Sequence, residues 1–162
     1  FGSVSFKQYL ETGRVEITTS HKKIKRMVTI KVNIGWCNKN YAASVDEQVP
    51  GAVVATDKTF EGVKQAIAEA VAFHVEGMQA DGDEVAAWLA DGDYQFEWIL
   101  ETSALLRSCE KYTSIAAISR ATGINEQLLS HYANGIKTPR RQQRERIVEG
   151  LHKIGREFLS VV

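Results

Sequence analysis

The stretch from Ser114 to Pro139, SIAAISRATGINEQLLSHYANGIKTP, predicts two short helices joined by a tight turn. Ser114 is a favourable N-cap, because its hydroxyl can accept a hydrogen bond from a free amide of the first helical turn. Gly123 predicts the end of the first helix, since glycine enters the left-handed conformation without steric cost. Asn125 then caps a second helix, which Asn134-Gly135 ends. These signals follow one another in register over 26 residues and so support one another.

Apolar side chains at helical spacing indicate which faces of the two helices are buried. They are Ile115, Ile118 and Thr122 in the first helix and Leu128, Leu129 and Tyr132 in the second, with Ile124 at the corner. Two helices around such a turn form the helix-turn-helix geometry, whose second helix enters the major groove of DNA. The alternative is a helical hairpin that serves only in dimerisation.

The segment SRATGINEQLLSHYANGIKTPR closely resembles the helix-turn-helix of the lambda-repressor-like (XRE-type) DNA-binding domains, and the resemblance runs from about Thr102 to Ser160. It implies that Asn125 to Asn134 is the recognition helix. The side chains that it places in the groove are Glu126, Gln127, Ser130 and His131. An amide can pair bidentately with adenine and a hydroxyl with several bases, so Gln127 and Ser130 have suitable chemistry. The resemblance also implies phosphate contacts, which set docking rather than sequence preference, from Lys137, Arg140 and Arg141.

The net charge of zero conceals an uneven distribution of charge along the chain. Residues 28–100 carry 4 basic and 12 acidic residues, whereas residues 1–27 and 101–162 each have a net charge of +4. The basic C-terminal part suits a polyanion such as DNA. The acidic middle part repels nucleic acid and attracts a basic protein, unless its acids only solvate a surface.

The middle of the chain predicts a small α+β domain. Alternating or short apolar runs predict strands, and a long amphipathic stretch predicts a helix capped by Asp57 or Thr59 and ended by Gly77. The expected strands are Met27–Ile34, Tyr41–Val45, Ala52–Ala55 and Tyr94–Leu100, with one short helical turn within Val85–Leu89. The predicted fold class is therefore α+β, with a small ββαβ-type domain followed by an all-α helix-turn-helix domain.

The string YAASVDEQVPGAVVATDKTFEGVKQAIAEAVAFHVEG resembles the HicB family of antitoxins. The residues at matching places are Tyr41, Pro50, Gly51, Thr59, Glu61, Ala66, Ala70 and Glu76. The resemblance implies a partly degraded RNase H-like fold for residues 27–100, which binds a small HicA-like toxin and covers its catalytic histidine. Residues 101–162 are then the DNA-binding domain that represses the toxin–antitoxin operon. Because the resemblance begins at Met27, Met27 is a candidate for the native start, and residues 1–26 form an N-terminal extension of unknown role.

A dense acidic segment is the candidate surface for the basic toxin. Its members are Asp81, Asp83, Glu84, Asp91 and Asp93, which lie within 13 residues and surround Trp88. Aromatic side chains are good anchors in protein interfaces. The alternative for Trp88 and Trp98 is ordinary core packing.

Two other classes of function are weighed against the antitoxin. A nuclease needs carboxylates that converge on two divalent metal ions, and the available acids are Asp46, Glu47, Asp57 and Glu61. The last two serve better as helix N-terminal charges, so we expect no enzyme, catalytic residue, metal or cofactor. A one-component regulator whose α/β domain senses a small molecule is the main alternative, and it needs a deep apolar pocket.

The remaining features concern location and assembly. Two cysteines, Cys37 and Cys109, are too few for a disulfide framework, which favours a reduced cytoplasmic setting, and we expect Cys37 to be a buried thiol. No apolar run reaches the ~20 residues that cross a membrane.

The last helix opens with RRQQRER and continues with apolar residues at helical spacing, namely Ile147, Leu151, Ile154, Phe158 and Leu159. This stripe predicts either the seam of a homodimer or higher homo-oligomer, or an intramolecular core.

Overall fold

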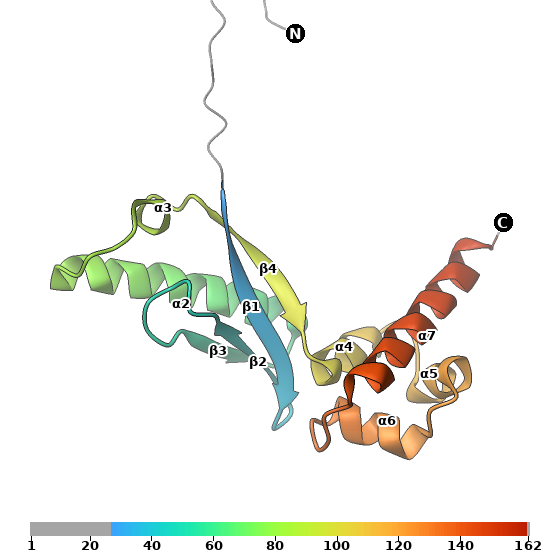
Figure 1. Ribbon diagram of the computed structural model, residues 1–162. Helices are drawn as coiled ribbons and strands as arrows, with labels where there is room; N and C mark the ends of the chain where they lie inside the picture. The colour runs from blue at the N-terminus through green and yellow to red at the C-terminus, as the bar shows by residue number, and fades with distance from the viewer. Residues whose placement is uncertain (1–26, 162) are drawn as a thin grey trace, which may run out of the picture.

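The computed structural model describes residues 27–161, so the expected N-terminal extension, residues 1–26, lies outside the described residues. Within residues 27–161 the protein has a mixed α and β fold with a four-stranded sheet and six helices. The sheet and its long helix lie at one end of the molecule, and four helices lie at the other (Figure 1). We call these parts the sheet module, residues 27–100, and the helical module, residues 101–161.

The sheet has the strand order β3-β2-β1-β4, with β1 at Val28–Cys37, β2 at Asn40–Val45, β3 at Val54–Asp57 and β4 at Tyr94–Leu100. The first three strands pair antiparallel, and β4 pairs parallel to β1 from Val28↔Tyr94 to Ile34↔Leu100. Parallel neighbours need a long crossover connection. Helices α2 (Phe60–Asp81) and α3 (Ala87–Ala90) form this connection.

Helix α2 covers one face of the sheet and forms the first hydrophobic core. The fully buried side chains of this core include Ile30, Val32 and Ile34 of β1 and Val63, Ile67 and Val71 of α2. Thr59 is the N-cap, as its hydroxyl accepts a hydrogen bond from Gly62 N at 3.0 Å. The predicted helix end at Gly77 is wrong, because the helix continues to Asp81 and is capped by Gly82. The third strand also begins two residues later than expected.

The helical module contains α4 (Thr102–Cys109), α5 (Ile115–Thr122), α6 (Glu126–Ala133) and α7 (Arg141–Leu159). The second core consists of Leu106, Ile118, Ile124, Leu129, Tyr132, Ala133 and Ile147. The predicted caps are confirmed. Ser114 Oγ accepts from Ala117 N at 3.1 Å, Gly123 has a φ of 69°, and Asn125 Oδ1 accepts from Gln127 N at 2.8 Å.

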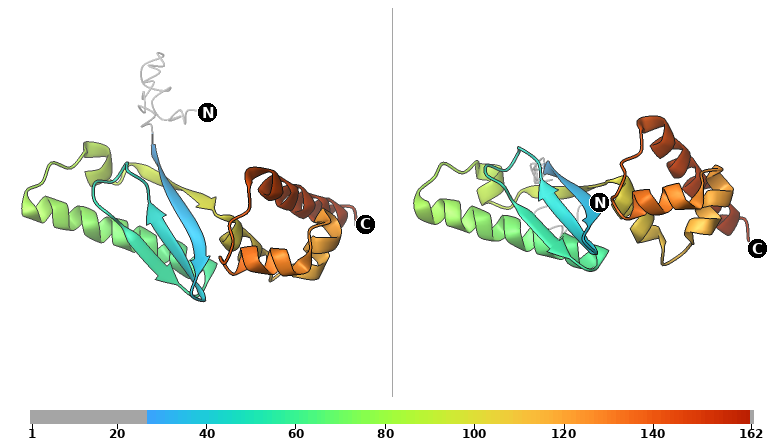
Figure 2. Two further views of the ribbon diagram at one scale, coloured as in Figure 1. Left: turned by 60° about the horizontal axis from the view of Figure 1, so that its bottom comes forward. Right: turned by 90° about the horizontal axis from the view of Figure 1, so that it is seen from below.

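The two modules join directly and lie side by side (Figure 2). Glu101 N donates to Ile34 O at 2.8 Å and so continues the β1–β4 pairing up to the start of α4. Arg144 of α7 donates from Nη1 to Thr102 Oγ1 at 2.8 Å and from Nη2 to Leu100 O at 2.7 Å. In the part of the chain that the structure describes, no helix combines the length and apolar character that spanning a bilayer requires.

Candidate functional site

Helix α6 carries all four residues predicted to contact bases, on the side that faces away from the second core. Glu126 and Gln127 in its first turn are exposed, and Ser130 and His131 are half-buried. The opposite side is buried through Leu129 and other core residues. Residues three and four positions apart lie on the same face of a helix. The structure therefore places Gln127, Ser130 and His131 next to one another on the outer face of α6.

Local hydrogen bonds hold both ends of α6. Asn125 caps the first turn, and at the other end Asn134 Nδ2 donates to Ser130 O at 2.8 Å and to Ser130 Oγ at 3.3 Å. Beyond Asn134 the chain turns back, and Ile136 N donates to His131 O at 2.9 Å. Ser130 Oγ accepts from Asn134 and keeps its own hydrogen for a further partner.

A basic depression lies beside α6, where the chain turns into α7. It is open to solvent, has a volume of about 640 Å³, and is lined by Tyr132, Lys137, Thr138, Arg140, Gln142, Gln143 and Arg146. We call it the basic cleft. The backbone amides at the start of α7 donate to no capping side chain, because the N-cap residue Arg140 has no side-chain acceptor. Free amides and the helix dipole both favour an anion at such a helix start.

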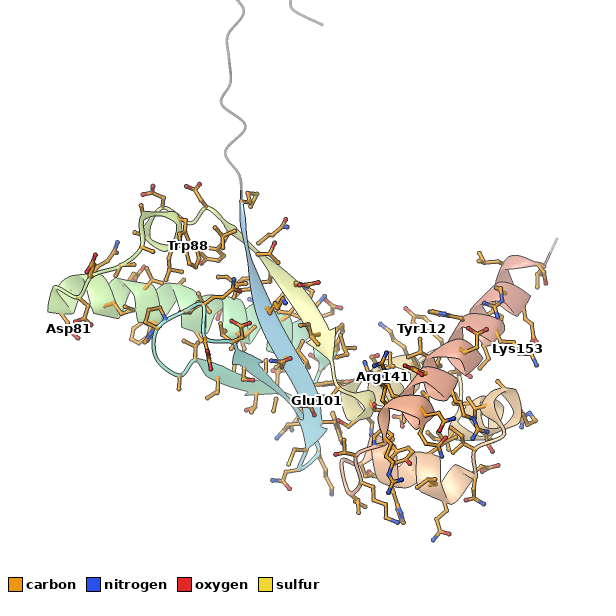
Figure 3. All side chains as sticks on the ribbon, in the orientation of Figure 1. Asp81, Trp88, Glu101, Tyr112, Arg141 and Lys153 are labelled. Carbon is orange, nitrogen blue, oxygen red and sulfur yellow. The ribbon has the colours of Figure 1, made fainter. Side chains whose placement is uncertain are left out.

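The structure brings two of the three predicted phosphate-contacting residues into the basic cleft, Lys137 and Arg140. Arg141 does not line it. Its side chain is 94% exposed and pairs with Glu145 at 2.8 Å, at the outer start of α7 (Figure 3).

Arg146 is a cleft residue that the sequence interpretation did not single out. Its Nη2 donates to Thr122 O at 2.9 Å, and its Nη1 donates to Gln143 Oε1 at 3.2 Å. The sequence signal was the spacing of Gln143 and Arg146, which lie three residues apart and therefore on one helix face.

The acidic residues gather at the end of the sheet module that points away from the helical module (Figures 1 and 3). Asp81 is the last residue of α2, and Asp83 and Glu84 follow in an exposed loop. Asp91 ends α3, and the half-buried Asp93 comes directly before β4. These five residues therefore surround α3, which carries Trp88.

Trp88 belongs to the first core. It is half-buried, packs against the core cluster and meets the Tyr94 ring edge-on, with the ring centroids 6.3 Å apart. The ring of Trp88 therefore packs in the core, as the alternative to an interface role expects, and its exposed part lies at the acidic surface.

Two of the four carboxylates considered for a nuclease, Asp46 and Asp57, hold local turns. Asp57 Oδ1 accepts from Thr59 N at 2.7 Å and from Thr59 Oγ1 at 2.8 Å. These hydrogen bonds, the backbone one first, hold the pKa of Asp57 below its ordinary value. Asp46 Oδ1 accepts from Gln48 N at 2.9 Å. Within residues 27–161, no three His, Cys, Asp or Glu side chains come together as a metal site.

The two cysteines lie in different surroundings. Cys37 is exposed at the end of β1, so the prediction of a buried thiol is wrong. It directly precedes the hairpin turn, whose two central residues, Asn38 and Lys39, have positive φ. Burial raises the pKa of the Cys109 thiol, which disfavours the reactive thiolate.

A second open depression, of about 540 Å³, lies between the modules and is lined by residues that include Trp36, Ile99, Thr102, Gly135 and Arg144.

Comparison with known protein families, with curated proteins and with solved structures finds no match for this chain.

Proposed function

We propose that this protein is the cytoplasmic antitoxin of a type II toxin–antitoxin pair and that it represses its own operon by binding operator DNA. The observation that carries the proposal is the exposed polar face of α6 beside the basic cleft. The protein acts without catalysis. It covers the active site of a small mRNA-cleaving toxin, and it represses transcription by occupying the promoter.

The geometry of α5, α6 and the basic cleft supports DNA binding. An α-helix fits the major groove, and the exposed Gln127 amide can pair bidentately with an adenine. Lys137, Arg140 and Arg146 line one open cleft beside α6, and their positive charges suit backbone phosphates. Base contacts then come from α6 and phosphate contacts from the cleft, which is the usual division of roles in DNA recognition.

The charge and position of the acidic surface support a separate protein partner. It lies at the end of the sheet module that points away from the helical module (Figure 1), whereas the residues that line the basic cleft belong to the helical module, so both partners can bind at once. Complementary charge speeds and orients the encounter with a basic toxin more than it tightens the complex. The partly degraded RNase H-like fold that the HicB resemblance implies is compatible with the observed four-stranded sheet and single long helix.

The DNA-binding part is tested by selection of random duplexes with the purified protein. We expect an enriched sequence with two half-sites, because a homodimer presents two copies of α6 about one helical turn, ~34 Å, apart. Recovery of unselected sequence, with equal affinity for all duplexes, contradicts operator recognition.

The antitoxin part is tested by purifying the tagged protein from its own cells and measuring the intact mass of its partners. We expect one stoichiometric basic partner, and the substitution Asp83→Lys with Glu84→Lys should reduce its recovery. A protein that binds selected DNA but carries no such partner contradicts the antitoxin role and favours the small-molecule sensor.

A further inference from the structure

Helix α4 of the helical module packs against β1 of the sheet module as well as against α6, and one arginine on α4 contacts both elements. Its residue Arg107 is largely buried, with 22% of the side chain exposed. The Arg107 guanidinium group lies over the Trp36 ring of β1, 5.3 Å from the ring centroid. Such a cation–π contact is stronger where it is shielded from water, as it is at this largely buried side chain.

The same guanidinium group holds the C-terminal end of α6. Arg107 Nε donates to Ala133 O at 3.1 Å, and Nη2 donates to Asn134 Oδ1. Ala133 is the last residue of α6, where carbonyl groups have no partner within the helix and a positive charge is favoured. Nη1 donates to Glu110 Oε1 at 2.7 Å, which fixes the guanidinium plane.

Trp36 is held on its backbone as well as on its ring. Its N–H donates to Ser103 Oγ of α4 at 3.0 Å. Its carbonyl oxygen lies against Gly135, where an added Cβ would come within 2.6 Å of it. The ring also packs edge-on against Tyr41 of β2, with centroids 4.8 Å apart. The β1–β2 hairpin therefore contacts α4 and the turn that follows α6.

We propose that Arg107 is a positioning residue that joins α6 to Trp36 and so makes DNA recognition by α6 depend on the sheet module. The proposal rests on the proposed DNA-binding function. Hydrogen bonds to base edges need donor–acceptor distances near 3 Å, so a small rotation of α6 removes them. A substitution in the sheet, far from the outer face of α6, consequently alters sequence preference.

The test compares two tryptophan substitutions in the full chain. Trp36→Leu removes the aromatic ring over which the Arg107 guanidinium group lies. Trp98→Leu removes another half-buried ring of the first core, which packs on the Phe96 ring with centroids 5.3 Å apart. We expect Trp36→Leu to lower the preference for a selected duplex over a scrambled one roughly tenfold. Trp98→Leu should leave that preference unchanged while lowering the stability of the sheet module.

Substitutions of Arg107 separate positioning from simple loss of charge. Arg107→Gln should lower the preference as Trp36→Leu does, and the double variant should lose no more than either single one. Arg107→Lys keeps a cation near the ring and should restore part of the preference. Arg156→Gln removes an exposed charge elsewhere on the helical module and serves as the control. Unchanged preference in Trp36→Leu, with α4 to α7 folded, overturns the proposal.

Unfolding gives a readout that does not depend on DNA. All three tryptophans lie in the sheet module, so their fluorescence follows that module alone. Far-ultraviolet circular dichroism follows the helices of both modules, so a helical module that unfolds separately adds a step to the dichroism that the fluorescence lacks. We expect coincident transitions in the unsubstituted protein and in Trp98→Leu, and separate transitions in Trp36→Leu. Separate transitions in the unsubstituted protein overturn the coupling. Coincident transitions without sequence-specific binding instead contradict only the proposed DNA-binding function.

Discussion

Single residues with special backbone geometry fix the turns around α6. Gly123 and Gly135 both have positive φ, at 69° and 71°, and they bracket the helix that we propose reads DNA. Gly135 has a second constraint, because its missing side chain leaves room for the Trp36 carbonyl. This residue therefore serves the turn and the contact between modules together.

We predict that Gly135→Ala destabilises the protein. The left-handed backbone alone costs a residue with a Cβ about 1–2 kcal/mol, and the close carbonyl adds to that cost. The matched control is Gly77→Ala, since Gly77 lies inside α2 and an added Cβ has nothing within 4 Å. Alanine there should stabilise by up to about 1 kcal/mol. Denaturant unfolding measures both, and an equal effect of the two substitutions contradicts this account of Gly135.

The caps around α6 were predictable because each depends on residues close in sequence. Ser114, Gly123 and Asn125 all act within three or four positions of themselves. The end of α2 was not predictable from Gly77, because a glycine is tolerated inside a helix when the following residues continue it. The left-handed cap forms instead at Gly82, where the helix ends.

Helix α2 begins with a network that depends on the ionisation of one carboxylate. Asp57 accepts two hydrogen bonds from Thr59, and Thr59 caps the helix. These bonds hold the pKa of Asp57 below its ordinary value, so the carboxylate stabilises the folded state above the pKa of the unfolded chain. This stabilisation is lost as the pH falls through the lower pKa of the folded state.

We predict that Asp57→Asn lowers the free energy of unfolding at neutral pH and that the difference shrinks as the pH falls. An amide keeps one acceptor oxygen but has no charge to favour the helix start. Urea unfolding of both proteins at pH 7 and at about pH 2 measures the difference, with the second value below the ordinary range of an aspartate. A difference that is equally large in acid contradicts the role of the charge.

Helix α7 passes from core to solvent along one apolar stripe. Ile147 is fully buried, whereas Phe158 is 62% exposed and Leu159 is 87% exposed. The second core accounts for the first half of the stripe but not for its end. We propose that the exposed end forms the seam of a homodimer that presents two copies of α6 to the operator.

We predict that Phe158→Asp converts a dimer to monomers, because a charge placed in an apolar seam is costly unless it is paired. Phe73→Asp is the control, since Phe73 is 78% exposed on α2, in the other module. Sedimentation equilibrium measures the masses. A monomeric unsubstituted protein, or a dimeric Phe158→Asp variant, contradicts the seam.

The arrangement of the whole molecule was only partly predictable. The four strands and the long helix follow from local patterns, but the contact between modules does not. Trp36 and Ser103 are 67 positions apart, and no local periodicity indicates that they meet. The basic cleft likewise needed the turn after α6 to bring Lys137 beside Arg146. The acidic residues around α3 were predictable as a group, because they are close in sequence.

We propose that α6 reads bases while the basic cleft binds phosphates, and titration of selected and scrambled duplexes over a range of salt separates these two roles. Gln127→Ala should lose about 1–3 kcal/mol on the selected duplex only. Arg140→Ala should weaken both duplexes and lower the salt slope by about 1. Equal losses on both duplexes for Gln127→Ala, or an unchanged slope for Arg140→Ala, contradict the claim.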